Sequence, residues 1–397
     1  MPTSSTQNVI QARIQRVEHG LPKMYATGPS KLGISAALSE RMQHYDVPGV
    51  SIAVINDYQI EWTQGYGVLE AGLDTPVTTD TLFHAGSIAK TLSAAAALTL
   101  VERGLLDLDE DVNDKLVSWQ VPENEFTLEQ KVTLRRLLSH SAGLQDGFTG
   151  RSSSDSEPTY LATAGEAPTV TIPDLLDAGP GMDVDGPTVV SMVPGTEYRY
   201  ANADYAIVEL IMVDATQQPF SELMAASILN PLEMSSSTFE QPLPEELRSS
   251  ATIEHDVSGQ ALEGKRHHFP MLAAGGLWTT PSDLARFALE VMLAYNGQSD
   301  ENPISQEMAI EMLSPQIDIQ GNPFYDSNGL GFHLSDAGQN FSFLHTGGTW
   351  GSSCVLLAYP ERGQGAVIMT NKASDQIGIF YEILLSIAAE YGWPMAQ

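Results

Sequence analysis

Strand-like segments lie near both ends of this 397-residue chain, and helical segments occupy the middle. An apolar run at 47–57 and its neighbour at 58–72 indicate a hairpin, and the last third adds apolar runs at 341–346, 352–360 and 365–372. Segments this far apart can form one sheet only if the two ends of the chain meet. We therefore predict an α/β (α+β) fold, in which an antiparallel sheet built from both chain ends is flanked by helices and joined by a mostly helical subdomain.

The same pattern predicts the domain boundaries. Residues 1–30 are polar, and we predict an N-terminal arm there, either a tail or a segment that packs on a partner subunit. The main domain then spans 31–397. Its α/β part comprises about 31–86 and 250–397, and its helical part comprises about 87–249.

The segment 150–195 is rich in Ser, Thr, Pro, Gly and acidic residues and has little hydrophobic periodicity. We predict a long surface excursion there, either the lid or wall of a pocket or a solvated loop without function. The cleft between the sheet and the helical part is the natural place for a binding site.

The chain is strongly acidic, with 50 Asp and Glu residues against 19 Lys and Arg and a net charge of −31. Binding to nucleic acid or to an anionic membrane surface is therefore not expected, because anionic phosphates would be repelled. Solubility explains this acidity, and so does a saline habitat; composition does not separate the two. A homo-oligomer is compatible with the same composition.

The location of the protein is predicted from what the sequence lacks. No apolar run is long enough to span a bilayer, and the N-terminus lacks the apolar core of a signal peptide. A cytoplasmic protein is the simplest expectation, although a secreted mature form would look the same. Cys354 is the one cysteine, so no intrachain disulfide can form, and its apolar flanks predict a buried, unreactive thiol.

Metal and cofactor chemistry is not expected. The histidines form no H-E-x-x-H pattern, and we predict that the pair His267 and His268 lies on the surface, since adjacent side chains diverge. The sequence also lacks G-x-S-x-G, which argues against the nucleophile elbow of an α/β-hydrolase.

The stretch "HAGSIAKTLS" carries the strongest chemical signal. If a helix begins at Ser87, Lys90 lies one turn later on the same face, so that the hydroxyl and the amine share one space. A serine hydroxyl becomes a nucleophile when a base takes its proton, and a buried lysine can act as that base. The alternative is an ordinary helix start with a lysine that reaches solvent. The apolar run "TLSAAAALTLV" predicts a buried helix and so favours the chemical role.

This S-x-x-K motif and two later motifs resemble the serine β-lactamase and penicillin-binding protein superfamily. The second motif, Y-x-N, is matched by Tyr200 and Asn202, and the third, K-T-G, is replaced here by His345, Thr346 and Gly347. The stretches "VPGVSIAVI", "LLSHSAGL" and "AAGGLWTTPSDLARF" resemble the class C β-lactamase-like branch, which includes family VIII esterase-like members. The resemblance covers the chain from about residue 34 and implies a β-lactamase-like catalytic domain over 31–397.

Roles for individual residues are implied by this resemblance. Ser87 would be the acylated nucleophile, and Lys90 and Tyr200 would move its proton. Asn202 would orient the substrate or Lys90. The backbone N–H groups of Ser87 and Gly348 would form an oxyanion hole. Tyr198 is an alternative to Tyr200, but Tyr198 lacks an asparagine two residues later.

The departure from the family lies at His345, where the β-lactamase branch usually has a lysine that binds the β-lactam carboxylate. A histidine is mostly neutral at neutral pH, so carboxylate binding should be weak and should improve as the pH falls. The resemblance then implies a serine hydrolase, most simply a carboxylesterase on small acyl esters with weak or no β-lactamase activity. A β-lactamase, a D-amino-acid amidase or aminopeptidase, an acyltransferase, and a penicillin-binding protein that deacylates slowly are the alternatives.

Overall fold

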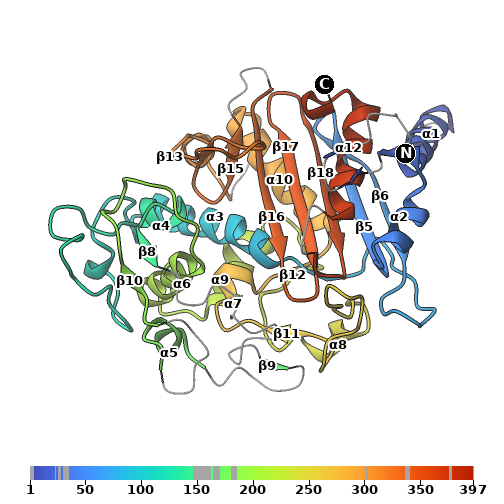
Figure 1. Ribbon diagram of the computed structural model, residues 1–397. Coiled ribbons are helices and arrows are strands. Elements are labelled where there is room, and N and C mark those ends of the chain that lie inside the picture. The colour runs from blue at the N-terminus through green and yellow to red at the C-terminus, as the bar shows by residue number, and fades with distance from the viewer. Residues whose placement is uncertain are drawn as a thin grey trace.

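Eight antiparallel strands form one sheet in this computed structural model (Figure 1). The model describes residues 4–22, 24–25, 28–29, 35–145, 162–163, 170–179, 186–299, 303–335, 340–374 and 378–396. The strand order is β13 (Ile317–Asp318), β14 (Ser327–Asn328), β15 (His333–Ser335), β16 (Ser342–Gly348), β17 (Ser353–Tyr359), β18 (Gln364–Thr370), β5 (Gly49–Asn56) and β6 (Gln59–Gly67). Strand β5 pairs with β18, with Ile52 opposite Ile368, so the predicted sheet built from both chain ends is confirmed.

The two faces of this sheet bury different helices. On one face, α10 (Pro281–Tyr295) packs on β5 and β18. On the other face, α12 (Ile379–Tyr391) packs on β18 and β17. The alternation of side chains along the strands explains the division: Leu356 of β17 joins the first core, whereas its neighbour Leu357 joins the second.

Helix α3 (Ala89–Glu102) lies at the centre of the helical part and is buried almost all round, as its apolar sequence predicts. It contacts α6 (Asn202–Thr216) and α9 (Leu272–Gly275). Smaller elements complete this side of the molecule: α4 (Leu134–Leu138), α5 (Ile172–Leu176), α7 (Phe220–Met224), α8 (Glu245–Arg248), α11 (Gln306–Met312), β7 (Phe83–His84), β8 (Leu144–Gln145), β9 (Ala162–Thr163), β10 (Val189–Val190), β11 (His267–His268) and β12 (Trp278–Thr279).

The N-terminal segment differs from the predicted arm. Residues Ser4–His19 form the helix α1, which packs on α12 of the same chain, beside α2 (Leu38–His44) (Figure 1). Ile14 and Val17 are buried in the core beneath it, and Arg16 forms an ion pair with Glu390. The helix therefore completes the core of its own chain, because its apolar residues recur at helical spacing. Short strand pairs follow it: β1 (Leu21–Pro22) with β4 (Ser35–Ala36), and β2 (Met24–Tyr25) with β3 (Gly28–Pro29).

The segment 150–195 is only partly a surface excursion. Its residues 150–161, 164–169 and 180–185 lie outside the described part of the chain. The described part includes α5, where Leu175 and Leu176 are fully buried, and β10, which pairs with β8. A helix of five residues is too short to produce a visible hydrophobic period, which is why composition suggested a loop.

Two further observations concern expectations from composition. The thiol of Cys354 is fully buried in β17 and donates to the carbonyl oxygen of Ala85, and burial raises its pKa, as predicted for an unreactive thiol. Within the described residues, we find no helix with the length and apolar character that crossing a membrane requires.

Candidate active site

Ser87 and Lys90 lie together where the helical part meets the sheet. Ser87 sits in a short 3₁₀ turn, η1 (Gly86–Ile88), which continues directly into α3. Lys90 is in the first turn of α3, and its Nζ atom lies 3.1 Å from Oγ of Ser87. Ser87 is partly exposed, whereas Lys90 has no exposed surface. The lysine therefore does not reach solvent, and the two side chains share one space.

The ammonium group of Lys90 is held by oxygen atoms from two further elements. It donates to Oδ1 of Asn202 at 2.9 Å and to the carbonyl oxygen of Ala274 at 2.7 Å. Asn202 is the first residue of α6, and Ala274 lies in α9. These hydrogen bonds compensate the burial of a cation and fix its position relative to Ser87.

Tyr200 is the tyrosine that lies over Lys90. The Nζ atom of Lys90 is 5.1 Å from the centre of the Tyr200 ring, and 37% of Tyr200 is exposed. Tyr198 lies deeper, where its ring contacts His140 and His333, and burial raises its pKa. The structure thus places Tyr200 with the other candidate residues and Tyr198 behind them.

A buried pair, His140 and Asp204, lies beneath Tyr200 and was not predicted from the sequence. Nδ1 of His140 lies 2.6 Å from Oδ2 of Asp204, and the His140 ring is 4.4 Å from the Tyr200 ring, centre to centre. Burial and the charge of Lys90 hold the pKa of His140 well below its usual value, so its neutral ring donates from Nδ1 to the carboxylate. The signal was available, since His140 lies in "LLSHSAGL" and Asp204 comes two residues after Asn202.

The third motif lies on β16, and its glycines allow two backbone segments to touch. A Cβ atom on Gly347 would lie 2.0 Å from the carbonyl oxygen of Ala85, and one on Gly86 would lie 2.7 Å from that of Gly348. Gly86 also has φ of +51°, which glycine adopts most readily. The turn that carries Ser87 therefore packs directly on Gly348, which brings together the two segments predicted to form the oxyanion hole.

His345 is buried and uncharged. Its Nδ1 atom donates to the carbonyl oxygen of Thr346 at 2.6 Å, and 3% of the residue is exposed. Burial, together with His333 and the charge of Lys90, holds the pKa of His345 well below its usual value. The ring is therefore neutral at pH 7, as expected. The ring also stays neutral at a mildly acidic pH, where an exposed histidine would be charged. We therefore no longer expect carboxylate binding at His345 to improve on mild acidification.

A second buried carboxylate, Glu254, connects the two segments that meet at Ser87. Its Oε1 atom accepts from Oγ1 of Thr349 at 2.6 Å and faces Nδ1 of His84 at 3.2 Å. Burial alone would raise the pKa of Glu254, but His84, His267 and the hydroxyl of Thr349 lower it to about 2. Thr349 follows Gly348, and His84 precedes Ser87 by three residues. We call Glu254, Thr349 and His84 the Glu254 network.

The prediction for His267 and His268 was wrong. Both side chains are buried, in the short strand β11, and the backbone N–H of His267 donates to Oε2 of Glu254 at 2.8 Å. The reason is the pairing of β11 with β9, which a two-residue strand does not reveal in the sequence. No group of three or more His, Cys, Asp or Glu side chains within the described ranges is arranged to hold a metal ion.

Comparison with known proteins identifies the family of the chain. The model of the Beta-lactamase family matches residues 34–383. Protein flp of Staphylococcus aureus (strain MRSA252) is 21% identical over 354 residues, which cover 88% of this chain but only 65% of that protein. Penicillin-binding protein 4 of Amycolatopsis lactamdurans is 28% identical over 368 residues and covers 88% of this chain and 87% of its own length.

Solved structures share the fold. The octameric penicillin-binding protein homologue from Pyrococcus abyssi superposes with a TM-score of 0.71 at 23% identity, covering 90% of this chain and 76% of that one. The β-lactamase/D-alanine carboxypeptidase from Yersinia pestis superposes with a TM-score of 0.67 at 19% identity, covering 89% and 94%. The fold is thus β-lactamase-like, and the family match extends over most of the sequence. The chain belongs to the Beta-lactamase family.

Proposed function

We propose that this protein is a carboxylesterase that hydrolyses small acyl esters through an acyl-enzyme on Ser87. The observation that carries the proposal is the neutral, buried His345 in the place of the usual lysine. Without a permanent cation there, the carboxylate of a β-lactam gains little binding energy, whereas an uncharged ester needs no such partner. Ester hydrolysis is therefore favoured over β-lactam hydrolysis.

In the proposed mechanism, Oγ of Ser87 attacks the ester carbonyl carbon while its proton passes to the phenolic oxygen of Tyr200, whose deprotonated form the neighbouring ammonium group of Lys90 favours. The N–H groups of Ser87 and Gly348 stabilise the negative charge on the carbonyl oxygen. The tetrahedral intermediate then breaks its bond to the alcohol, which leaves with the proton. Water attacks the acyl-enzyme with help from the same two side chains and releases the acid. Asn202 holds Lys90 in place, since its Oδ1 lies 2.9 Å from Nζ.

The second candidate is an amide-type activity, either β-lactamase or D-amino-acid amidase or peptidase. The names of the relatives favour it, because they include penicillin-binding protein 4 and a β-lactamase/D-alanine carboxypeptidase. Slow deacylation would instead make the chain a penicillin-binding protein without turnover, and transfer to an alcohol other than water would make it an acyltransferase. All of these use the same acylated serine.

The experiment that separates the candidates is steady-state hydrolysis of p-nitrophenyl butyrate beside nitrocefin, for the wild type and Ser87→Ala. Turnover of the butyrate that needs Ser87, with little nitrocefin cleavage, supports the esterase. Fast nitrocefin cleavage would identify a β-lactamase instead. Butyrate turnover that survives in Ser87→Ala would remove Ser87 as the nucleophile, and a burst without turnover would point to slow deacylation.

Self-association is part of the same proposal, because the solved homologue from Pyrococcus abyssi is described as octameric. The apolar side of helix α1 packs against α12 of its own chain, so the contact between copies would use another surface. Light scattering after size exclusion tests this, and a mass of one chain at all concentrations would contradict it.

A further inference from the structure

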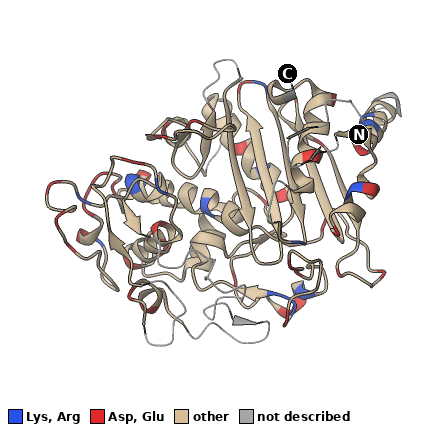
Figure 2. Ribbon diagram, viewed as in Figure 1, with Lys and Arg blue, Asp and Glu red and all other residues tan. Residues whose placement is uncertain are grey.

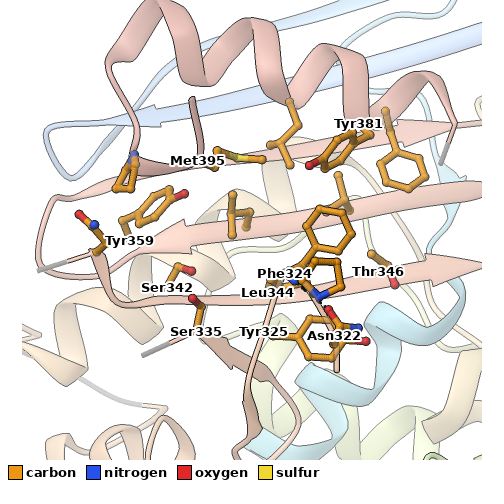
Figure 3. Close-up of a pocket in the computed structure, with 17 residues that line it drawn as sticks. Asn322, Phe324, Tyr325, Ser335, Ser342, Leu344, Thr346, Tyr359, Tyr381 and Met395 are labelled. Atoms are coloured by element: carbon orange, nitrogen blue, oxygen red, sulfur yellow. Dashed lines mark hydrogen bonds between the residues drawn. The ribbon is translucent and has the colours of Figure 1, made fainter. Parts of the chain in front are cut away.

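A cavity of about 600 Å³ lies on the face of the sheet opposite to the one that contacts the turn of Ser87. Its floor is formed by β16 and β17, and its walls by α12 and by residues 322–325 (Figure 3). Side-chain alternation explains its position. Gly347 contacts the turn that carries Ser87, so Thr346 and Leu344 point to the opposite face, where Leu344 joins the core beneath α12. We call this space the β16–β17 cavity.

The lining of the β16–β17 cavity is uncharged and mostly apolar, with Asn, Ser and Thr side chains among its residues. Its floor carries Leu344, Val355 and Leu357, and aromatic rings surround it, including Phe324 and Tyr381. None of the described residues that line it is charged, although the chain contains 50 Asp and Glu residues. A volume of this size is typical of small-molecule sites, and an uncharged lining favours an alkyl or aromatic group over an ion.

Strand β16 lies between the cavity and the candidate active site, and Thr346 is the cavity residue that belongs to the third motif. This residue lines the cavity and stands between His345 and Gly347 on β16. The pairing of β15 with β16 ends where His333 lies opposite Leu344, so the edge of β16 beside Thr346 is not covered by β15. An ester substituent that leaves Ser87 along this unpaired edge would reach the cavity at Thr346.

A stack of rings joins the wall of the cavity to the same site. Tyr325 lines the cavity, and its ring lies 4.1 Å from that of His333 with 7° between the planes. His333 in turn lies 5.0 Å from His345 with 17° between the planes. The wall is thus held in a fixed position relative to the third motif, as a preformed binding site requires.

We propose that the β16–β17 cavity binds an apolar substituent of the ester that Ser87 attacks, so that the substrates are esters with a long alkyl or an aromatic group. This inference rests on the proposed ester hydrolysis. The floor from Thr346 to Ser342 spans about 13 Å, at roughly 3.3 Å per residue, which accommodates a chain of several carbon atoms. On the alcohol side, the substituent is compatible with the small acyl group proposed above; on the acyl side, it would extend the proposed range to longer acyl groups. The experiment below distinguishes the two.

The test compares two series of esters. The acyl series runs from p-nitrophenyl acetate to p-nitrophenyl decanoate, and the alcohol series runs from ethyl to octyl butyrate. We expect kcat/KM to rise at least about tenfold along one series, because each buried methylene group adds to binding. The series that responds identifies the side of the ester in the cavity. A flat response in both series would overturn the proposal.

A variant that fills the cavity provides the second test of the proposal. Leu357→Trp places a large ring in the floor, and Val117→Trp, at a position 80% exposed, is the matched control. Leu357→Trp should lower kcat/KM at least about tenfold for the long ester and leave the shortest ester within about twofold, whereas Val117→Trp should change neither. An equal loss for long and short esters would contradict the proposal. If Leu357→Trp does not fold, Leu384→Phe on α12 tests the same space.

A binding measurement separates this inference from the proposed function. The fluorescent fatty acid cis-parinaric acid is titrated into Ser87→Ala and into the double variant Ser87→Ala/Leu357→Trp, neither of which can form an acyl-enzyme on Ser87. Binding that is lost in the double variant supports the cavity as an apolar site even if no ester is hydrolysed. Equal binding to both, or to neither, would overturn the cavity proposal while leaving Ser87-dependent hydrolysis of short esters intact.

Discussion

The imidazole ring of His333 stacks on that of His345, 5.0 Å apart and 17° from parallel. Both rings are buried, and Lys90 is the cation that acts on both. Burial and this charge lower the pKa of each, to about 4 for His333. The position that carries a lysine in the β-lactamase branch is therefore occupied here by an uncharged ring that packs against a second one.

Replacing His345 by lysine should move the activity towards β-lactams. A cation at this position would attract the carboxylate of nitrocefin, so we expect kcat/KM for nitrocefin to rise about tenfold, with p-nitrophenyl butyrate little changed. His345→Gln, which stays neutral, is the control. If the lysine and glutamine variants treat nitrocefin alike, charge at this position does not decide the substrate.

His333 should make the protein less stable as the pH falls. Its folded pKa of about 4 is below the unfolded value of 6.5, so the unfolded chain binds a proton first. Stability is therefore lost as the pH falls from 6.5 towards 4, by roughly 3 kcal/mol in total. The test is to measure the unfolding free energies of the wild type and His333→Gln in urea at several pH values. Their difference isolates the contribution of His333 from that of Glu209, whose raised pKa of about 8 makes stability change with pH in the opposite direction. A difference that does not change with pH would contradict it.

Tyr200 and Tyr198 should differ in their effect on turnover. Tyr200→Phe removes the phenol that lies over Lys90, so we expect kcat for p-nitrophenyl butyrate to fall by about 100-fold or more. Tyr198→Phe removes a deeper hydroxyl and should cost less than about fivefold. Rapid-mixing kinetics would show whether acylation or deacylation is slowed. Equal losses in both variants would remove the distinction between the two tyrosines.

The Glu254 network should position the oxyanion hole through Thr349. Thr349→Val keeps the shape of the side chain but removes the hydrogen bond to Glu254, so we expect kcat to fall about tenfold with KM nearly unchanged. Thr349→Ser restores the hydroxyl and should recover most of the rate. Equal losses for valine and serine would mean that packing, rather than the hydrogen bond, explains the effect.

Helix α1 should stabilise its own chain. Ile14→Ala removes buried apolar atoms from the core that α1 shares with α12, which should lower the unfolding free energy by about 2–4 kcal/mol. Gln11→Ala, on the exposed side of the helix, should have little effect. Both variants should keep the wild-type kcat. Were α1 instead an arm for a partner subunit, Ile14→Ala would change the oligomeric mass and not the unfolding free energy.

Local patterns predicted the features that depend on neighbouring residues. The spacing of Ser87 and Lys90 is a property of one helical turn, and the continuous apolar runs of β5 and β17 are a property of each strand. The helical spacing of Ile10, Ile14 and Val17 was also present and should have predicted α1.

The remaining features depend on residues that meet only after folding. Glu254 is separated from His84 by 170 positions and from Thr349 by 95, and no local pattern relates them. Asp204 and His140 are likewise 64 residues apart. Polar residues in such pairs look like surface residues in a sequence, because burial of each is acceptable only in the presence of the other.

The pairing of β5 with β18 has a consequence for biosynthesis. Val50 lies opposite Thr370, so more than three quarters of the chain must leave the ribosome before these two strands can meet. The turn that carries Ser87 packs against β16, which is synthesised only shortly before β18. Such distant contacts make folding slow. Strand β5, with apolar residues on both faces, can pair early with β6 but lacks its second neighbour until β18 has been made. A nascent chain of this protein therefore exposes an apolar strand edge during most of its synthesis.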